Sequence, residues 1–462
     1  MIRSSRIKAA FAVGIVIAAL GTTPGAAHAR EGRLDPAYGQ RGVAMTGLGT
    51  AGPEPDVEIT VDGASAFVAS GSDGTAVRLL PDGSPDTRFG EDGRFVVAPG
   101  SQLGGLEGQE FFPSSLTIDH RGRVLVFGSL LNASREAQGA EGSPVSPTLA
   151  AVLRYGAEGQ LDAFGGGKGY TIGRFGLSPE LLTGFPRIGA LAGKVDAGNR
   201  PVFVAGAAER VEGCYAKGTV EYVPRAVVRL TAAGRPDPHF GGGGVSPIFG
   251  SGELPSLGID AEGKPVVGVG NVGSYAAACG EGSILYRFRP DGRLLPHGRH
   301  VFESMHLAVV QPSGAMVLSE GRGSTIEVSR LRPDGTREFG FGDHGVARVR
   351  LPRIAASHVL PAAVDRRGRI LLVGNVDPAD LGGKKSKPKQ SSFVVGRLLP
   401  DGRLDRSFGK GGWLFTHLPR PLELLEVQAS LDSRGRLLVG GSVTGPGKES
   451  GGFAVARYLL GP

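Results

Sequence analysis

One phrase recurs along the chain and constrains its fold more than any other feature. In its best copies the phrase reads Gly-x-x-Asp-x-x-Phe-Gly, where x is any residue. Seven copies begin at Gly32, Gly83, Gly159, Gly234, Gly292, Gly335 and Gly402, and those at Gly292 and Gly335 are degenerate. A period of about sixty residues indicates a chain built from one repeated unit that buries its core against neighbouring units.

An arginine stands at a fixed position in the strand-like stretch before each copy after the first. These arginines are Arg78, Arg154, Arg229, Arg287, Arg330 and Arg397. The residue eight positions later is acidic in five of the six units (Asp86, Asp162, Asp237, Glu338 and Asp405) and is Leu295 in the other. A buried guanidinium needs an anionic partner, because an unpaired buried charge is strongly destabilising. We interpret the pairs as a structural clasp, since a device repeated in nearly every unit is typical of a scaffold and not of a catalytic site.

The two ends of the chain read as halves of one unit. The last strand-like stretch, 453–458, carries Arg457, but the chain ends before an acid eight positions later. Asp35 stands in the first copy of the phrase with no arginine strand before it. We therefore predict that Asp35 meets Arg457 and that the stretch 42–46 pairs near 453–458.

Each unit also contains a hairpin of two apolar strands around a tight turn. The turns lie at 62–63, 119–122, 196–198, 260–263, 311–314, 365–368 and 432–435, and all but one begin with Asp. The aspartate can hydrogen-bond the backbone, and the glycine that ends or follows the turn supplies a positive φ. With the arginine strand and the strand after the phrase, each unit has four strands.

This arithmetic predicts an all-β fold, a seven-bladed β-propeller of four-stranded antiparallel blades closed by pairing of the N- and C-terminal strands. Such a closure leaves no edge strand exposed. The 78 Gly and 32 Pro, with 40% hydrophobic residues, agree with many short strands and exclude a helical bundle or a coiled coil. An open β-solenoid and two smaller propellers are the alternatives.

Residues 1–29 have the pattern of a secretory signal peptide. Three cations precede an apolar run at 9–20, and the triplet Ala27-His28-Ala29 predicts cleavage before Arg30. The alternative is a membrane anchor, for which the run is short. We expect residues 30–462 to form a single propeller domain that is secreted or extracytoplasmic and has no membrane span. Without the leader cations, basic residues exceed acidic ones by only four, which does not favour nucleic acid as a partner.

Few residues are candidates for a disulfide, a metal site or a catalytic site. Cys214 and Cys279 are the only cysteines, and such a pair in an exported protein predicts a disulfide, with two free thiols as the alternative. The histidines do not have the spacing of zinc ligands, and no motif for a nucleophile or a phosphate loop is found. The turn aspartates are better explained as turn caps than as calcium ligands. The sequence therefore predicts no catalytic residues, no cofactor and no metal.

One loop carries a dense run of positive charge, at Lys384, Lys385, Lys387 and Lys389. The run is a candidate contact for an anionic envelope polymer or a lipid surface, and a solvated loop is the alternative. Further long insertions are expected at 103–112, 133–146 and 210–221. These insertions and the mouth of the axial channel are where a ligand would meet differences between the blades.

The extended phrase Gly-x-Leu-Asp-x-x-Phe-Gly-x-x-Gly, with a Pro-Asp-Gly turn and an arginine strand before it, resembles the delta-60 repeat family. The match is clearest at 83–93 and 402–412, and the resemblance covers residues 32–462. It implies a bacterial exported β-propeller of unknown function and carries no activity with it.

The sequence thus favours a non-catalytic binding or scaffold module at the cell envelope. We expect a monomer whose partner is an envelope glycan or protein. The alternative is a propeller-based lyase or hydrolase with its site at one channel mouth.

Overall fold

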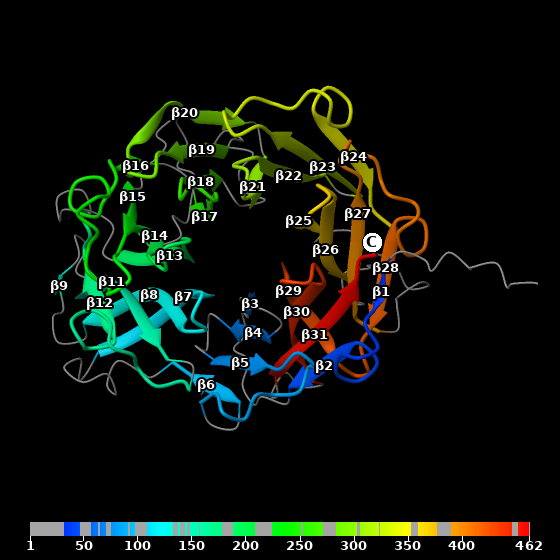
Figure 1. Ribbon diagram of the computed structural model, residues 1–462, viewed down its shortest axis with the longest axis horizontal. Coiled ribbons are helices and arrows are strands. Elements are labelled where there is room, and N and C mark those ends of the chain that lie inside the picture. Colours follow the sequence, from blue (N-terminus) through cyan, green and yellow to red (C-terminus); the bar gives the residue numbers. More distant parts are fainter. Residues whose placement is uncertain are drawn as a thin grey trace, which may run out of the picture.

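Seven antiparallel sheets are arranged as blades in a ring in the computed structural model (Figure 1). The structure describes residues 32–46, 57–62, 65–70, 75–90, 93–97, 109–132, 137–138, 144–145, 148–156, 158–177, 188–207, 224–250, 253–270, 283–302, 305–322, 324–352, 359–376, 390–445 and 451–461. The prediction of a seven-bladed β-propeller is therefore confirmed.

Each blade takes its strands from one stretch of the chain, except the last. Blade 1 comprises β3 (Val57–Asp62), β4 (Ser65–Ser70), β5 (Thr75–Leu79) and β6 (Arg94–Val96). Blade 2 comprises β7 (Gln109–Ile118), β8 (Val124–Asn132), β11 (Thr148–Tyr155) and β12 (Tyr170–Gly173), with a ribbon of β9 (Ala137–Gln138) and β10 (Pro144–Val145) between β8 and β11 in sequence. Blade 3 comprises β13 (Ile188–Val195), β14 (Pro201–Ala207), β15 (Pro224–Arg229) and β16 (Phe249–Gly250).

The next three blades follow the same plan. Blade 4 comprises β17 (Glu253–Ile259), β18 (Pro265–Gly270), β19 (Ser283–Phe288) and β20 (Leu294–Phe302). Blade 5 comprises β21 (His306–Val310), β22 (Met316–Arg322), β23 (Thr325–Leu331) and β24 (Val346–Arg350). Blade 6 comprises β25 (Leu360–Val364), β26 (Ile370–Val376), β27 (Ser392–Leu398) and β28 (Trp413–His417).

Blade 7 is built from both ends of the chain. The C-terminal region supplies β29 (Glu423–Leu431), β30 (Leu437–Thr444) and β31 (Gly451–Leu459), and the N-terminal region supplies β1 (Arg33–Leu34) and β2 (Val43–Thr46). Both N-terminal strands pair antiparallel with β31, which Figure 1 shows as blue β2 beside red β31. Val43 is opposite Ala456 and Thr46 is opposite Phe453, which confirms the predicted closure.

The order of strands within a blade follows the repeat. The first strand of each hairpin lies nearest the axis, and the strand that follows the recurring phrase lies at the periphery (Figure 1). The arginine strand is the third from the axis. It is therefore flanked by strands of its own blade on both sides, while neighbouring blades cover its faces.

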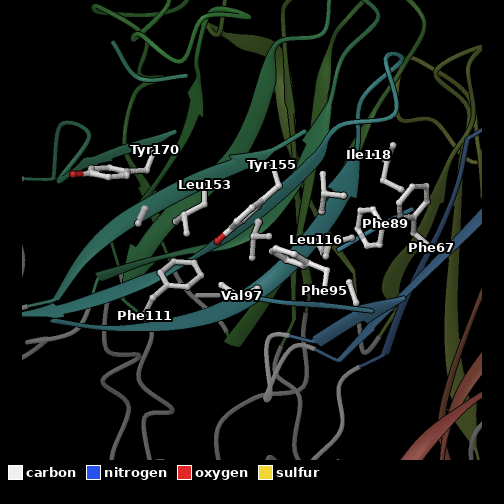
Figure 2. Close-up of a cluster of buried hydrophobic side chains, with 14 of the residues drawn as sticks. Phe67, Phe89, Phe95, Val97, Phe111, Leu116, Ile118, Leu153, Tyr155 and Tyr170 are labelled. Carbon is white, nitrogen blue, oxygen red and sulfur yellow. The ribbon is translucent and has the colours of Figure 1, made fainter. Parts of the chain in front are cut away.

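The hydrophobic core is divided into clusters that lie between neighbouring blades. Figure 2 shows the cluster between blades 1 and 2, where Phe67, Phe89 and Phe95 meet Leu116 and Tyr155. The rings of Phe95 and Tyr155 are 4.2 Å apart at their centroids. Because both faces of the middle strands are covered, all described residues of β27 and β30 are buried, which explains the consecutive apolar residues at 393–395 and 437–439.

Blade 4 departs from the others where the phrase is degenerate. Its outer strand β20 begins at Leu294, two residues after the turn glycine Gly292, and continues to Phe302. The boundary between blades 4 and 5 therefore falls between Phe302 and His306, where β21 begins.

Several predictions concern residues outside the described part of the chain. These are the signal peptide at 1–29, the cysteines Cys214 and Cys279, and the basic run Lys384, Lys385, Lys387 and Lys389. Among the described residues, no helix is long and apolar enough to cross a membrane.

The shared seventh blade leads to a first prediction. A chain that begins at residue 47 lacks β1 and β2, so that the edge of β31 is exposed and Arg457 loses Asp35. We expect a lower midpoint of thermal unfolding and association through the exposed edge, measured by calorimetry and gel filtration.

A chain that begins at residue 32 is the matched control and should behave as the full chain does. A peptide spanning 32–46, added to the truncated chain, should restore part of the lost stability. Equal stability of the two truncated chains would contradict closure by β2.

Candidate functional site

The ring has two faces with different connections. Strand directions alternate within each blade, so the hairpin turns and the turns before the recurring phrase lie at the same end of the blades. We call this end the turn face. The connections between the second and third strands, and those between blades, leave from the opposite end, which we call the loop face.

The arginine and the acid of the repeat meet on the turn face. In blade 3, Arg229 Nε donates to Asp237 Oδ2 at 2.8 Å, and its guanidinium lies over the ring of Phe240 at 4.6 Å. Its Nη1 donates to the carbonyl of Pro290 in blade 4 at 2.6 Å. Arg229 is buried, so a carboxylate, an aromatic face and a backbone carbonyl together replace its hydration.

The other predicted pairs have the same arrangement. The nitrogen–oxygen distances are 2.8 Å for Arg78–Asp86, 2.8 Å for Arg154–Asp162, 2.6 Å for Arg330–Glu338, 2.7 Å for Arg397–Asp405 and 2.9 Å for Arg457–Asp35. The aromatic residue of the phrase lies under the guanidinium in each: Phe89, Phe164, Phe341, Phe408 and Tyr38 respectively. The arginine therefore holds the phrase against its own strand.

The same arginines connect neighbouring blades. Arg154 Nη1 donates to Ala232 O in blade 3 at 2.5 Å, and Arg457 Nη1 donates to Pro81 O in blade 1. The glycine that ends the phrase donates to the next turn as well, for example from Gly241 to Asp291 O at 2.6 Å. Each clasp thus fixes both a blade and its contact with the following blade.

A second cation, which the sequence reasoning missed, completes three of the clasps. In blade 2 the hairpin ends in Arg123, which lies 2.5 Å from Asp119 and 3.2 Å from the clasp carboxylate Asp162. Arg200 bridges Asp196 and Asp237 in blade 3, and Arg436 bridges Asp432 and Asp35 in blade 7. We call this set of two arginines and two aspartates the clasp quartet. An arginine or lysine four residues after the turn aspartate, in five hairpins, was the available signal.

Blade 4 replaces the missing acid with neutral acceptors. Arg287 donates to Pro333 O at 2.5 Å and to His297 O at 3.3 Å, and its Nη2 lies 3.2 Å from His300 Nε2. Burial lowers the pKa of the Arg287 guanidinium, and burial together with this guanidinium lowers the pKa of His300. His300 is therefore a neutral imidazole that accepts a hydrogen bond near neutral pH.

Four of the clasp acids, Asp86, Asp237, Glu338 and Asp405, have lowered pKa values. The hydrogen bond from Arg88 lowers the pKa of Asp86, and the hydrogen bond from Arg330 lowers the pKa of Glu338. Burial alone would raise the pKa of Asp237 and Asp405, but hydrogen bonds and arginine charges outweigh it and leave both pKa values below the ordinary range. Carboxyls of this kind carry no proton to donate near neutral pH, so they do not suit a general acid.

Two further histidines among the described residues lie beside a hydroxyl or a cavity. His417 Nδ1 lies 2.7 Å from Ser392 Oγ, but this buried hydroxyl belongs to a cross-strand pair of β27 and β28, away from the axis. His306 borders a cavity of about 110 Å³ between blades 4 and 5, and the lining of this cavity is largely apolar. Burial lowers the pKa of the His306 imidazole. Within the described ranges, no three His, Cys, Asp or Glu side chains are grouped so as to hold a metal ion.

Comparisons with known proteins agree with the fold. A family model described as a domain of unknown function (DUF5122) beta-propeller matches residues 54–89. The Dos1 propeller is similar to this chain at a TM-score of 0.43 and 11% identity, over 90% of this chain and 94% of that one. A protein of unknown function from Dyadobacter fermentans DSM 18053 has a TM-score of 0.37 and 13% identity, over 76% of this chain and 95% of that one.

A PQQ-bound aldose sugar dehydrogenase from Streptomyces coelicolor is similar at a TM-score of 0.36 and 12% identity, over 76% of this chain and 97% of that one. No curated protein matches the chain. Likenesses of this size carry no argument about activity.

The clasp leads to a second prediction. Asp405→Ala leaves the fully buried guanidinium of Arg397 without its carboxylate. We expect the free energy of unfolding to fall by about 3–5 kcal/mol, measured by urea denaturation. Arg397→Met combined with Asp405→Leu should recover part of this loss, because no buried charge then remains.

The control for this change is Arg403→Ala, which removes an exposed ion pair with Asp401 from the neighbouring turn. That variant should unfold at nearly the wild-type urea concentration. If it destabilised the protein as much as Asp405→Ala, burial would not be the source of the clasp's effect.

A third prediction concerns acid stability. Because the pKa values of Asp86, Asp237, Glu338 and Asp405 are lowered in the folded state, the unfolded chain binds more protons in acid. The stability that these groups contribute is present above their unfolded pKa of about 4 and is lost as the pH falls through their folded pKa values.

Urea midpoints measured from about pH 7 down to about pH 3 should therefore decrease, and more steeply below about pH 4. Asp405→Asn should flatten this dependence, whereas Glu262→Gln, at an exposed carboxylate outside the clasps, should leave it unchanged. An Asp405→Asn profile parallel to that of the wild type would refute the assignment.

Proposed function

We propose that the protein is an exported, non-catalytic binding or scaffold module of the cell envelope that holds its partner through the loop face. The proposal includes secretion by a leader at 1–29, a disulfide between Cys214 and Cys279, and repeats of the delta-60 type. The observation that carries it is the unequal character of the two faces.

On the turn face, the hairpin connections are short and alike from blade to blade. The hairpin connections are 63–64, 119–123, 196–200, 260–264, 311–315, 365–369 and 432–436. The carboxylates of the repeat are bound within clasps there, and their pKa values, where shifted, are lowered. The charged side chains that recur on this face are paired with each other in contacts that hold the ring together. Few of them are therefore free to bind a substrate.

On the loop face, the connections differ strongly from blade to blade. Those between the second and third strands are 71–74, 133–147, 208–223, 271–282, 323–324, 377–391 and 445–450. Loops of unequal length on a rigid scaffold are where binding residues concentrate. The predicted basic run Lys384, Lys385, Lys387 and Lys389 belongs to one of these connections, so an anionic glycan polymer or an acidic protein surface suits this face.

The fourth prediction tests this face directly. Immobilised full-length protein is incubated with envelope glycans and proteins, and the captured material is compared with that of a variant in which Lys384, Lys385, Lys387 and Lys389 are changed to Gln. We expect the variant to capture less anionic material, and the difference to shrink at high salt because exposed charges are screened.

A matched control removes the same number of charges from the turn face, by changing Arg289, Arg332, Arg406 and Lys410 to Gln; all four side chains are exposed. Capture by this control should equal that of the wild type. Equal capture by both variants and the wild type would remove the basic run from the site, and no capture by the wild type would count against a binding role at the envelope.

A further inference from the structure

A cavity of about 360 Å³ opens on the turn face beside the clasp of blade 1. Its polar wall includes Arg78, Asp86 and Glu158, and its apolar wall includes Phe67 and Leu80. Pockets for small groups have volumes from about 300 Å³ upward and combine apolar walls with a few polar groups. The cavity therefore has both the size and the lining of a binding pocket.

The other blades show what belongs at this position. The sheet register aligns Ser65 of blade 1 with the hairpin arginines Arg123, Arg200, Arg369 and Arg436 of blades 2, 3, 6 and 7. Each of these arginines stands two residues before the strand partner of its clasp arginine. In blades 2, 3 and 7 its guanidinium reaches the clasp carboxylate at 3.2, 3.4 and 3.5 Å respectively. The serine leaves the corresponding space in blade 1 unfilled.

A substitute reaches the same carboxylate from the solvent side. Arg88 Nε lies 3.0 Å from Asp86 Oδ1, and its Nη2 lies 3.3 Å from Oδ2. The Arg88 side chain is 77% exposed, whereas that of Asp86 is 6% exposed. Because the Arg88 side chain is largely exposed, it can move aside into solvent while Asp86 stays in place.

We propose that this cavity binds the guanidinium group of an arginine side chain on a peptide or protein partner. The incoming group takes the place that a hairpin arginine occupies in the clasp quartets and donates to Asp86. Glu158 is the second carboxylate within the cavity, and Phe67 and Leu80 pack against the aliphatic stem. Together with Arg78, the bound ligand gives two guanidinium groups and two carboxylates, the same groups as in a clasp quartet.

The chemistry of the cavity favours this occupant over others. A planar guanidinium can donate to a carboxylate through two parallel bonds, which an ammonium group cannot do. An anionic ligand would meet the carboxylates of Asp86 and Glu158. The site is on the turn face and is independent of the loop face on which the proposed function depends.

The fifth prediction tests the site by titrating the full-length protein with the peptide acetyl-Gly-Arg-Gly-amide, using its lysine counterpart for comparison. We expect saturable binding of the arginine peptide, at least about fivefold tighter than that of the lysine peptide. Ser65→Arg fills the cavity from within, so it should weaken binding at least about tenfold and raise the midpoint of thermal unfolding. Arg88→Ala removes the competing side chain and should tighten binding about threefold or more.

Ala315→Arg is the matched control, because residue 315 occupies the same register position in blade 5, where Glu338 already accepts two bonds from Arg330. It should leave peptide binding unchanged. The proposal is overturned if the wild type shows no saturable binding, if the lysine peptide binds as tightly, or if binding survives Ser65→Arg in a folded protein. The envelope-capture experiment alters other residues, so its failure and the failure of this site are separate outcomes.

Discussion

The buried or partly buried arginine on the third strand of each blade makes the interactions on which the rest of the ring depends. A guanidinium removed from water must find hydrogen-bond acceptors and a counter-charge, and no single loop supplies them all. Its own blade provides the carboxylate and the aromatic face, and the next blade provides the backbone carbonyl, as for Arg229 with Asp237, Phe240 and Pro290. A blade is therefore electrostatically complete only beside a neighbour, which favours a closed ring over an open stack.

The same interaction gives the turn face and the loop face different properties. The turn face repeats its ion pairs from blade to blade, so its charges are largely neutralised within the protein. On the loop face, the connections between the second and third strands differ strongly in length. On the turn face, blade 1 has Ser65 where four other blades have arginine, and a cavity opens beside Asp86. A break in a repeated pattern is where a repeat protein gains a feature that its other units lack.

The blades and the closure could be predicted because their determinants are short-range or repeated. An aspartate and a glycine close to each other in a hairpin turn act locally, and the eight-residue spacing of Arg397 and Asp405 spans one tight turn. The hairpin arginine was missed because its second partner is distant in sequence, as Arg123 is from Asp162. The shifts of register in six of the seven innermost strands, such as that between Pro113 and Ser115, left no pattern in the sequence either. In blade 4, the role of His300 beside Arg287 arises only when β20 runs back along β19.

The sequence by itself determined the number of units, the four strands in each, the acidic partners of the clasp arginines other than Arg287, and the joining of Asp35 to Arg457. It could do so because the same pattern of residues recurs in nearly every unit. Only the tertiary structure decided which hairpin arginines reach a clasp carboxylate, which backbone carbonyls of the next blade receive the guanidinium groups, and where a cavity remains. These outcomes depend on contacts between side chains of separate blades. Such side chains are far apart in the sequence, and their separation in the sequence does not indicate that they are in contact.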